Sequence, residues 1–458
     1  MSFPPGKLRS GNDYTAHGAI ILDDFDMLQH LQTAQSRNSD VDKANDDEPV
    51  IPFTPPPQRD FDVHHQRSQP AHLSRFEPPR RSSRLAAPQD SRVTRAARRA
   101  SEQAVLGTRL KSVVRKHVTN AAPVHITTTP DDYPVTSTGW GGIREKPVQP
   151  RTYSLEELQQ EFGMKIVDWD GRSSRPLVDR ESRIIGVLGG RPNDAGYLDL
   201  TREAARQLEA QRENIKMHPG KAEGRRGTFT SASYGISFGG GQQIPGNLKQ
   251  SPATTHVINM LFLMQCFIRI AGFGNGLFKA WNPEVHAFYE FTLDALTNQY
   301  NPNLRRNFQQ KVSAFAAATL NFGPSTVTLP HIDCLNLAWG WCAITALGLF
   351  DPDLGGHLVL WDLKLIIRFP PGSTILIPSA ILRHSNIGIQ LGETRYSFTQ
   401  FTAAGLFRWV DNGFKSDLTA VAETQADPEA QAARARARQT RWSDGIESFK
   451  RWKGPRAA

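Results

Sequence analysis

Short β-rich runs separated by glycine and proline turns fill residues 326–402, and this pattern constrains the fold of the chain most strongly. The runs recur about every 8–12 residues, the spacing of a β-sandwich or barrel. We expect strands over residues 358–360, 365–369, 374–377, 387–389 and 396–401. This part of the chain should therefore form a β-sandwich or a barrel.

Helical patterns precede the β-rich region. Ser154 and Glu157 have the spacing of a capping box, so a helix should begin there. A strand is expected at residues 184–188 and an amphipathic helix at residues 201–216. Two long helices should follow. The first covers the apolar run 257–273, and the second begins with Asn282 as its cap and Pro283 as its first residue.

Two stretches among these elements need a separate interpretation. The glycine-rich stretch 234–246 lacks the Gly-Lys-Ser/Thr ending of a phosphate-binding loop, so it is either a flap over a site or a plain connection. The apolar run 257–273 contains Asn259, Gln265 and Arg269 and falls short of the roughly 20 residues of a membrane span. We therefore expect a buried helix there, with no membrane partner.

The composition divides the chain into four parts. Residues 1–150 hold 16 of the 31 prolines and few apolar periods, which predicts a disordered, Pro/Arg-rich basic region. Residues 151–250 are expected to form the α/β N-terminal part of the catalytic region, with the glycine-rich loop. Residues 251–415 should form helices and the β-rich core, and residues 416–458 a basic C-terminal tail.

The positive charge is concentrated outside the expected core. Residues 75–116 carry 12 basic and 3 acidic residues, an excess equal to the net charge of +9 of the whole chain. Residues 430–458 add 8 basic and 2 acidic residues. Both flanks suit DNA or RNA, and the stretch 91–117 is open to three explanations: a solvated charge run, a nuclear-import signal or a nucleic-acid tether.

The cysteine content and the N-terminus favour a reducing compartment. Cys266, Cys334 and Cys342 include no Cys-x-x-Cys pair, so neither a disulfide framework nor a cysteine-rich zinc module is expected. The first residues contain no apolar stretch typical of a secretory signal. We expect a nuclear or otherwise cytoplasmic protein that is not secreted.

A group of metal-ligand residue types lies within the β-rich region. His331 and Asp333 are two positions apart, and alternate residues of a strand point to the same side. A later strand can add His384 to the same point. Two histidines and one carboxylate on one face of an octahedral ion leave three positions open, as in non-haem Fe(II) oxygenases. About one His-x-Asp/Glu motif is expected by chance in such a chain. The motif alone therefore does not identify a metal site, and further sequence elements are needed.

Further elements follow in a fixed order. Gly355 and Gly356 open an apolar strand, Pro371-Gly372 precedes the next, and Arg395 and Ser397 come shortly after His384. This order over residues 330–401 resembles that of the 2-oxoglutarate/Fe(II)-dependent dioxygenases. The resemblance implies an α+β fold whose core is a double-stranded β-helix (jelly-roll, cupin-like), with supporting helices and a disordered N-terminal region.

The resemblance also implies residue roles. His331, Asp333 and His384 are expected to bind Fe(II), and Arg395 with Ser397 to hold the distal carboxylate of 2-oxoglutarate, with O2 as the other cosubstrate. Arginine suits this task because its planar fork makes two charge-assisted hydrogen bonds to a carboxylate. The chain is therefore expected to be an oxidoreductase that releases succinate and CO2.

One branch of this superfamily is most similar. The sequence from His331 to Asn336 and the surrounding strings resemble the TET/JBP-like nucleobase oxygenases, including their expanded copies in basidiomycete fungi. By this resemblance Asn336 lies beside the target base and Phe401 stacks on it, although both could equally serve packing. The chain lacks the cysteine-rich zinc region of animal TET enzymes.

Three functions remain to be distinguished. The first is oxidation of the methyl group of a methylated nucleobase in DNA or RNA. The second is hydroxylation of a protein or a small molecule on the same scaffold. The third is a catalytically inactive binding protein, which the intact set of ligand residues and the Arg395-x-Ser397 pair disfavour.

Overall fold

The computed structural model describes residues 6–7, 13–14, 117–118, 121–144, 151–215, 226–309 and 311–453. Contacts divide the chain into two units, Met1–Ser91 and Arg92–Ala458. In the first unit the structure describes one short antiparallel pair, β1 (Gly6–Lys7) with β2 (Asp13–Tyr14). Most of the predicted disordered region 1–150, including the basic stretch 75–116, lies outside the described residues.

A sheet of nine strands forms the larger layer of the second unit. Its order is β3-β5-β6-β13-β10-β15-β9-β7-β8, and β10, β13, β15 and β9 are joined by antiparallel pairings at its centre. The strands are β3 (Val124–His125), β5 (Arg175–Val178), β6 (Ile184–Gly190), β7 (Ser231–Ser237), β8 (Gly246–Asn247), β9 (Ala317–Asn321), β10 (Cys342–Leu349), β13 (Thr374–Ile377) and β15 (Thr394–Phe401).

A sheet of four strands forms the smaller layer, in the order β14-β11-β12-β4. Its strands are β4 (Lys165–Val167), β11 (Leu358–Leu360), β12 (Leu365–Ile367) and β14 (His384–Asn386). From β10 onward the chain crosses between the two sheets, with β11 and β12 in the small sheet, β13 in the large, β14 in the small and β15 in the large. This alternation is that of a double-stranded β-helix and confirms the predicted fold class.

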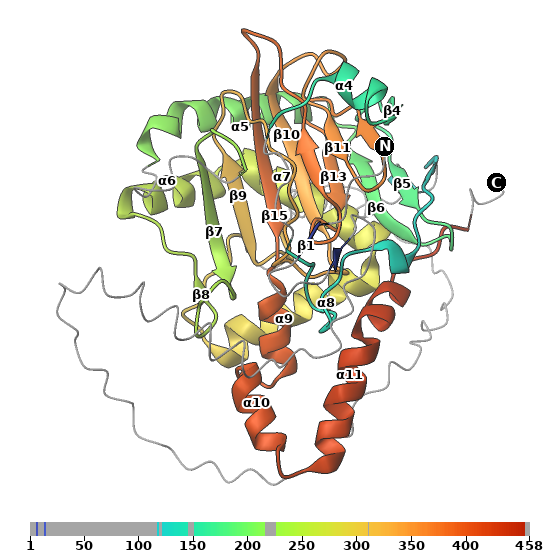
Figure 1. Cartoon of the computed structure of the whole chain (residues 1–458). Coiled ribbons are helices and arrows are strands. Elements are labelled where there is room, and N and C mark those ends of the chain that lie inside the picture. The colour runs from blue at the N-terminus through green and yellow to red at the C-terminus, as the bar shows by residue number, and fades with distance from the viewer. Residues whose placement is uncertain are drawn as a thin grey trace, which may run out of the picture. The chain divides into compact units, whose positions relative to one another are not determined.

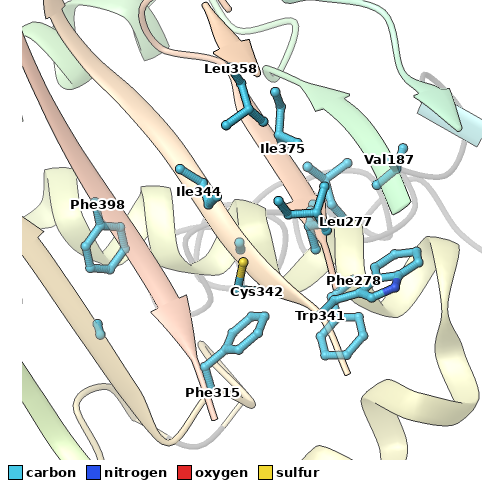
Figure 2. Packing of buried hydrophobic residues seen from close by; sticks show 14 of the residues in the cluster. Val187, Leu277, Phe278, Phe315, Trp341, Cys342, Ile344, Leu358, Ile375 and Phe398 are labelled. Atoms are coloured by element: carbon cyan, nitrogen blue, oxygen red, sulfur yellow. The ribbon is translucent and has the colours of Figure 1, made fainter. Parts of the chain in front are cut away.

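Helices cover one face of the large sheet (Figure 1). The α5 and α7 helices contact β10, and α7 also contacts β6 and β13. Figure 2 shows Leu277 and Phe278 of α7 among the buried side chains of the sheet, with Val187 of β6 nearby. The helices are α4 (Leu155–Gln160), α5 (Tyr197–Gln211), α6 (Pro252–Leu263), α7 (Gln265–Trp281), α8 (Pro283–Asp294), α9 (Ala404–Asp411), α10 (Asp417–Thr424) and α11 (Pro428–Glu447), with short helical turns η3 (Pro130–Asp132), η4 (Arg212–Asn214) and η5 (Ala295–Tyr300).

Several sequence predictions hold at the level of single elements. The Ser154 and Glu157 side chains form the expected capping box of α4. Pro283 is the first residue of α8, and Asn282 is its N-cap, although its side chain makes no capping hydrogen bond. The predicted strands at 358–360 and 374–377 match β11 and β13.

Two predicted elements differ from the structure. The expected single helix over 257–273 is two helices, α6 and α7, which meet at an angle of 71° because Met264 between them has an extended backbone. The strand expected at 387–389 is instead β14, three residues earlier, because its pairing with β11 begins at His384. Within the described ranges no single helix has the length and apolar composition of a membrane span, and only the bent pair α6 and α7 together meets both criteria.

Both ends of the second unit are more ordered than composition suggested. Residues 121–144, inside the expected disordered region, bury Val124 and Trp140 in the main core. The expected C-terminal tail forms α10 and α11, and Phe449 beyond them is buried in the same core. The correction has one cause at both ends: a few widely spaced apolar side chains dock there without the regular period that identifies a helix or strand.

Candidate active site

The structure brings three predicted ligand residues to one point. His331, Asp333 and His384 each offer one ligand atom, and these atoms all lie within 4.8 Å of one another. The His331 Nε2 is 3.8 Å from Asp333 Oδ1, and the His384 Nε2 is 4.0 Å from Asp333 Oδ2. These separations suit three ligands that share one ion, since each would sit about 2 Å from it.

The backbone positions these residues from both sheets. His331 lies next to His384, the first residue of β14, and their main chains form an antiparallel bridge. The Asp333 amide donates to the carbonyl of Ser379, which follows β13, at 2.9 Å. Each ligand is therefore held by main-chain hydrogen bonds to a different part of the jelly roll.

The two imidazole rings are oriented by the same device. His331 Nδ1 is 2.7 Å from the carbonyl oxygen of Leu329, and His384 Nδ1 is 2.8 Å from that of Leu382. An imidazole that donates from Nδ1 to a carbonyl keeps its proton there. The Nε2 atoms are then lone-pair donors that face the Asp333 carboxylate, the form in which histidine binds a metal.

The electrostatics keep the ligands in metal-binding protonation states. Burial lowers the pKa of both His331 and His384, so both rings are neutral at neutral pH. Burial alone would raise the pKa of Asp333, but Arg226 and the two histidines lower it below its usual value. Two neutral imidazoles and one ionised carboxylate are a ligand set for a divalent cation.

Arg395 lies on β15 as a buried cation. Its side chain is 1% exposed, and one guanidinium nitrogen, Nη1, donates to the Thr326 carbonyl at 2.8 Å. Among the described residues no carboxylate pairs with it, and its Nε has no hydrogen-bond partner. Burial lowers the pKa of Arg395 to about 10, so it still carries its charge at neutral pH. A buried, charged guanidinium with an unpartnered Nε is suited to bind an anion.

Ser397 lies two residues further along β15, on the same side as Arg395. Its Oγ accepts a hydrogen bond of 2.7 Å from the side-chain amide of Asn321, which lies opposite on β9. Ser397 is therefore held in place with its hydroxyl proton available to a ligand beside Arg395.

Asn336 and Phe401 lie at the two ends of this arrangement. The Asn336 amide donates to Ser379 Oγ at 3.1 Å, so Ser379 contacts both Asp333, through its carbonyl, and Asn336. Phe401 ends β15 on the same strand face as Arg395 and is half-buried against the core. Asn336 borders the metal cluster through Ser379 and Asp333, and the predicted contacts of Asn336 and Phe401 with a base stay predictions.

Three residues of the site were not predicted from the sequence. Arg226 forms an ion pair with Asp333 and is 42% exposed, so a cation lies at the opening of the metal cluster. Ser379 and Asn321 position Asp333 and Ser397. The only signals in the sequence are the basic Arg225-Arg226 pair and the Pro378-Ser379 turn, and neither has a specific spacing from the ligands.

No family model and no curated protein matches the chain. Among solved structures, NgTET1 in complex with 5mC DNA is 13% identical, with 55% of this chain and 88% of that chain covered and a TM-score of 0.37. An oxidoreductase of the 2OG-Fe(II) oxygenase family from Burkholderia pseudomallei is 15% identical, with 47% and 93% covered and a TM-score of 0.25.

The chain has a double-stranded β-helix fold that carries a cluster of metal-ligand residues. This assignment rests on the order of strands in the two sheets and on the three ligand residues that the bridge between His331 and His384 brings together. Arg395 and Ser397 lie on β15, the strand that follows His384 of β14, and their predicted role toward a cosubstrate stays a prediction.

Proposed function

We propose that the protein is a 2-oxoglutarate/Fe(II)-dependent dioxygenase that oxidises the methyl group of a methylated nucleobase in DNA or RNA. The observation that supports it best is the pairing of two features in one jelly roll. The metal-ligand cluster of His331, Asp333 and His384 is accompanied by Arg395, a buried cation with no carboxylate partner among the described residues. A metal site alone does not require such a cation, whereas a dicarboxylate cosubstrate does.

His331, Asp333 and His384 would hold the iron, and Arg395 with Ser397 would hold the distal carboxylate of 2-oxoglutarate. When both are bound, they supply oxygen activation, in which O2 and 2-oxoglutarate are consumed, succinate and CO2 leave, and a C–H bond becomes C–OH. The protein's own contribution is position. Backbone bridges hold the ligands, Asn321 holds Ser397, and neutral imidazoles keep the metal site free of competing protons.

Water exclusion is the second contribution of this chain. Ile344 of β10 and Ile375 of β13 lie near Leu358 of the small sheet, and all three are buried in the core cluster (Figure 2). An apolar layer between the two sheets keeps bulk water from the space behind the site. A reactive centre in such surroundings reacts with the substrate before it is quenched by solvent.

The substrate class is supported by the residues around the metal. Asn336 lies one turn from Asp333, and its amide and the half-buried Phe401 are the groups suited to a base edge and a base face. The basic flanks at 75–116 and 430–458 supply charge that a nucleic-acid partner would neutralise, and a nuclear location fits such a partner.

The test separates the reaction from its substrate. Succinate formation from 2-oxoglutarate with Fe(II) should require His331 and Asp333, so equal turnover by native chain and His331→Ala would refute the reaction class. Oligonucleotides with 5-methyl or N-methyl bases are then incubated with the native chain, and oxidised bases are sought by mass spectrometry. Brisk succinate formation without any oxidised base would favour a protein or small-molecule hydroxylase.

A further inference from the structure

Polar side chains continue across the large sheet from Ser397 toward the β7 strand. The antiparallel pairing of β15 with β9 and of β9 with β7 places three residues side by side in each row. Two neighbouring rows carry hydroxyl or amide side chains at all six positions: Ser397, Asn321 and Ser231 in the first, and Thr399, Thr319 and Ser233 in the second.

Both rows lie on the side of the sheet that carries Arg395. Alternate residues of a strand share a face, and so do residues directly opposite each other on paired antiparallel strands. Two side-chain hydrogen bonds agree with this placement. Asn321 donates to Ser397 at 2.7 Å, and the hydroxyl oxygens of Ser233 and Thr319 are 2.7 Å apart.

Among the described residues, this face is less buried toward β7 than the opposite face. On the opposite face Phe398 is buried against the Phe262 and Phe267 rings of the helical layer. Toward β7, by contrast, Ser231 is exposed, and the second row is half-buried. We call the residues Ser231, Ser233, Thr319 and Thr399 the polar shelf. A sheet face that packs in a protein core normally carries apolar side chains. The hydroxyl groups of the polar shelf are instead suited to a polar ligand.

A surface cavity lies at the β7 edge of the polar shelf. Its volume is about 390 Å³, and Gln250 in its wall donates from Nε2 to the Ser233 carbonyl at 2.8 Å. The Asn247 side chain stiffens another wall, because it donates to the Asn303 carbonyl at 3.1 Å and accepts from the Arg305 amide at 3.0 Å. Tyr234 and Thr255 of the helical side also line the cavity, so it lies at the sheet edge on that side and meets the polar shelf through the Gln250 contact with Ser233.

The cavity is cationic. Lys249 and Arg305 line it, both are exposed, and neither has a carboxylate partner among the described residues. Two free cations with amide groups beside them match the charge and the hydrogen-bonding demand of a phosphate group. Serine and threonine hydroxyls are also among the usual partners of phosphate and sugar oxygens in nucleic-acid complexes.

We propose that this cavity binds a backbone phosphate of the nucleic-acid strand, and that the strand runs from the metal site over the polar shelf and around the β7 edge into the cavity. This inference rests on the proposed nucleic-acid substrate. The strand leaves the neighbourhood of Arg395 over neutral hydroxyls and reaches Lys249 and Arg305 at the sheet edge. The contact is independent of base identity, because phosphates carry no sequence information.

The double variant Lys249→Glu with Arg305→Glu tests the cavity. Binding of a methylated single-stranded oligonucleotide to the full chain is followed by fluorescence anisotropy over a salt series. We expect Kd to rise about tenfold at low salt and the salt slope to fall by about one phosphate contact. Succinate formation without oligonucleotide should be unchanged. The matched control is Lys165→Glu, an exposed lysine on β4 in the small sheet, which should leave both quantities unaltered.

The polar shelf has its own variant. Thr319→Val keeps the shape of the side chain and removes the hydroxyl, so it should weaken binding severalfold without changing the salt slope. Unchanged Kd and salt slope in the double variant would overturn the inference. The inference would also be overturned if millimolar inorganic phosphate bound in the cavity while oligonucleotide Kd was the same in the native chain, in the double variant and in Thr319→Val. If the native chain binds no oligonucleotide at all, the proposed function fails instead.

Discussion

His331 and His384 hold each other through their main chains. The amide of each donates to the carbonyl of the other, at 3.1 and 2.9 Å, and the two ring centroids are 4.3 Å apart. Because these bonds involve only backbone atoms, two of the three metal ligands are set in place by strand pairing before any ion binds.

Removing one imidazole should therefore abolish metal binding and leave the fold intact. We expect His331→Ala to lower Mn(II) affinity by more than about 100-fold, beyond the effect of losing an outer-shell partner. Its melting temperature without metal should stay near that of the native chain. Calorimetric titration measures the affinity, and His256→Ala, an exposed histidine on α6, is the control. Unchanged affinity in His331→Ala would contradict the site.

Arg395 should bind the cosubstrate and should contribute little to the stability of the protein without it. Methionine at this position removes a buried cation that has no carboxylate partner among the described residues, so Arg395→Met should unfold at a temperature no lower than the native chain. The native chain should gain about 2.7 kcal/mol from 2-oxoglutarate at 100 times its Kd, whereas Arg395→Met should gain none. Thermal unfolding with and without the cosubstrate measures both, and an equal gain would exclude the assigned role.

His286 of α8 should make the protein less stable in mild acid. Its ring is 1% exposed, and its Nε2 is 3.0 Å from Asn275 Oδ1. Burial lowers the pKa of His286 to about 3, although Glu290 lies 3.5 Å from its Nδ1. The unfolded chain takes up this proton near pH 6.5, so the contribution is complete above that pH and declines as the pH falls toward 3.

The size of this effect follows from the pH interval. Between pH 6.5 and 5 the native chain should lose about 2 kcal/mol of unfolding free energy through His286. His286→Gln keeps a donor toward Asn275 and cannot be protonated, so it should lose about 2 kcal/mol less over the same interval. Urea unfolding at the two pH values gives the unfolding free energies. An equal loss of unfolding free energy between pH 6.5 and 5 in both proteins would refute the burial argument.

The C-terminal segment should behave as part of the core. Phe449 is 2% exposed, and its ring packs edge-on against Trp341, with 6.0 Å between centroids. We expect Phe449→Ala to lower the unfolding free energy by about 3 kcal/mol. Arg436→Ala, at an exposed position of α11, should change it by less than about 0.5 kcal/mol. Chemical denaturation measures both, and a similar small effect for Phe449→Ala would mean that this segment is a tail.

Two N-terminal deletions should differ sharply. Removal of residues 1–116 takes away the basic stretch, so nucleic-acid affinity and its salt slope should fall while succinate formation persists. Removal of residues 1–150 also takes away Val124 and Trp140 from the core and should yield unstable protein. Anisotropy and thermal unfolding distinguish the two, and equal stability of both products would contradict the observed packing.

The accuracy of the strand predictions depended on what specified each strand. The strand β13 is apolar at all but its first position and bounded by turns, so its limits were predictable. The strand β14 is His-Ser-Asn, without β-branched or aromatic residues, and is a strand only because β11 pairs with it. The predicted strand was therefore placed on the apolar residues at 387–389, which follow β14 in the chain.

Some residues of the candidate site could be predicted from the sequence and others could not. His331, Asp333, His384 and Arg395 were predicted because their order along the chain resembles that of the 2-oxoglutarate/Fe(II)-dependent dioxygenases. The partners of these residues come from elsewhere: Arg226 reaches Asp333 from a loop before β7, and Asn321 reaches Ser397 through the register of β9 with β15. Such contacts form only when the sheets assemble, so no spacing in the sequence predicts them.

The C-terminal segment forms a bridge to the start of β6 from a distant part of the chain. The amide of Ile184 at the start of β6 donates to the Lys450 carbonyl at 2.9 Å, and the amide of Trp452 donates to the Ser182 carbonyl at 2.7 Å. During synthesis, β6 leaves the ribosome long before these partners exist. The nascent chain therefore carries β6 without these two hydrogen bonds until Trp452 has emerged.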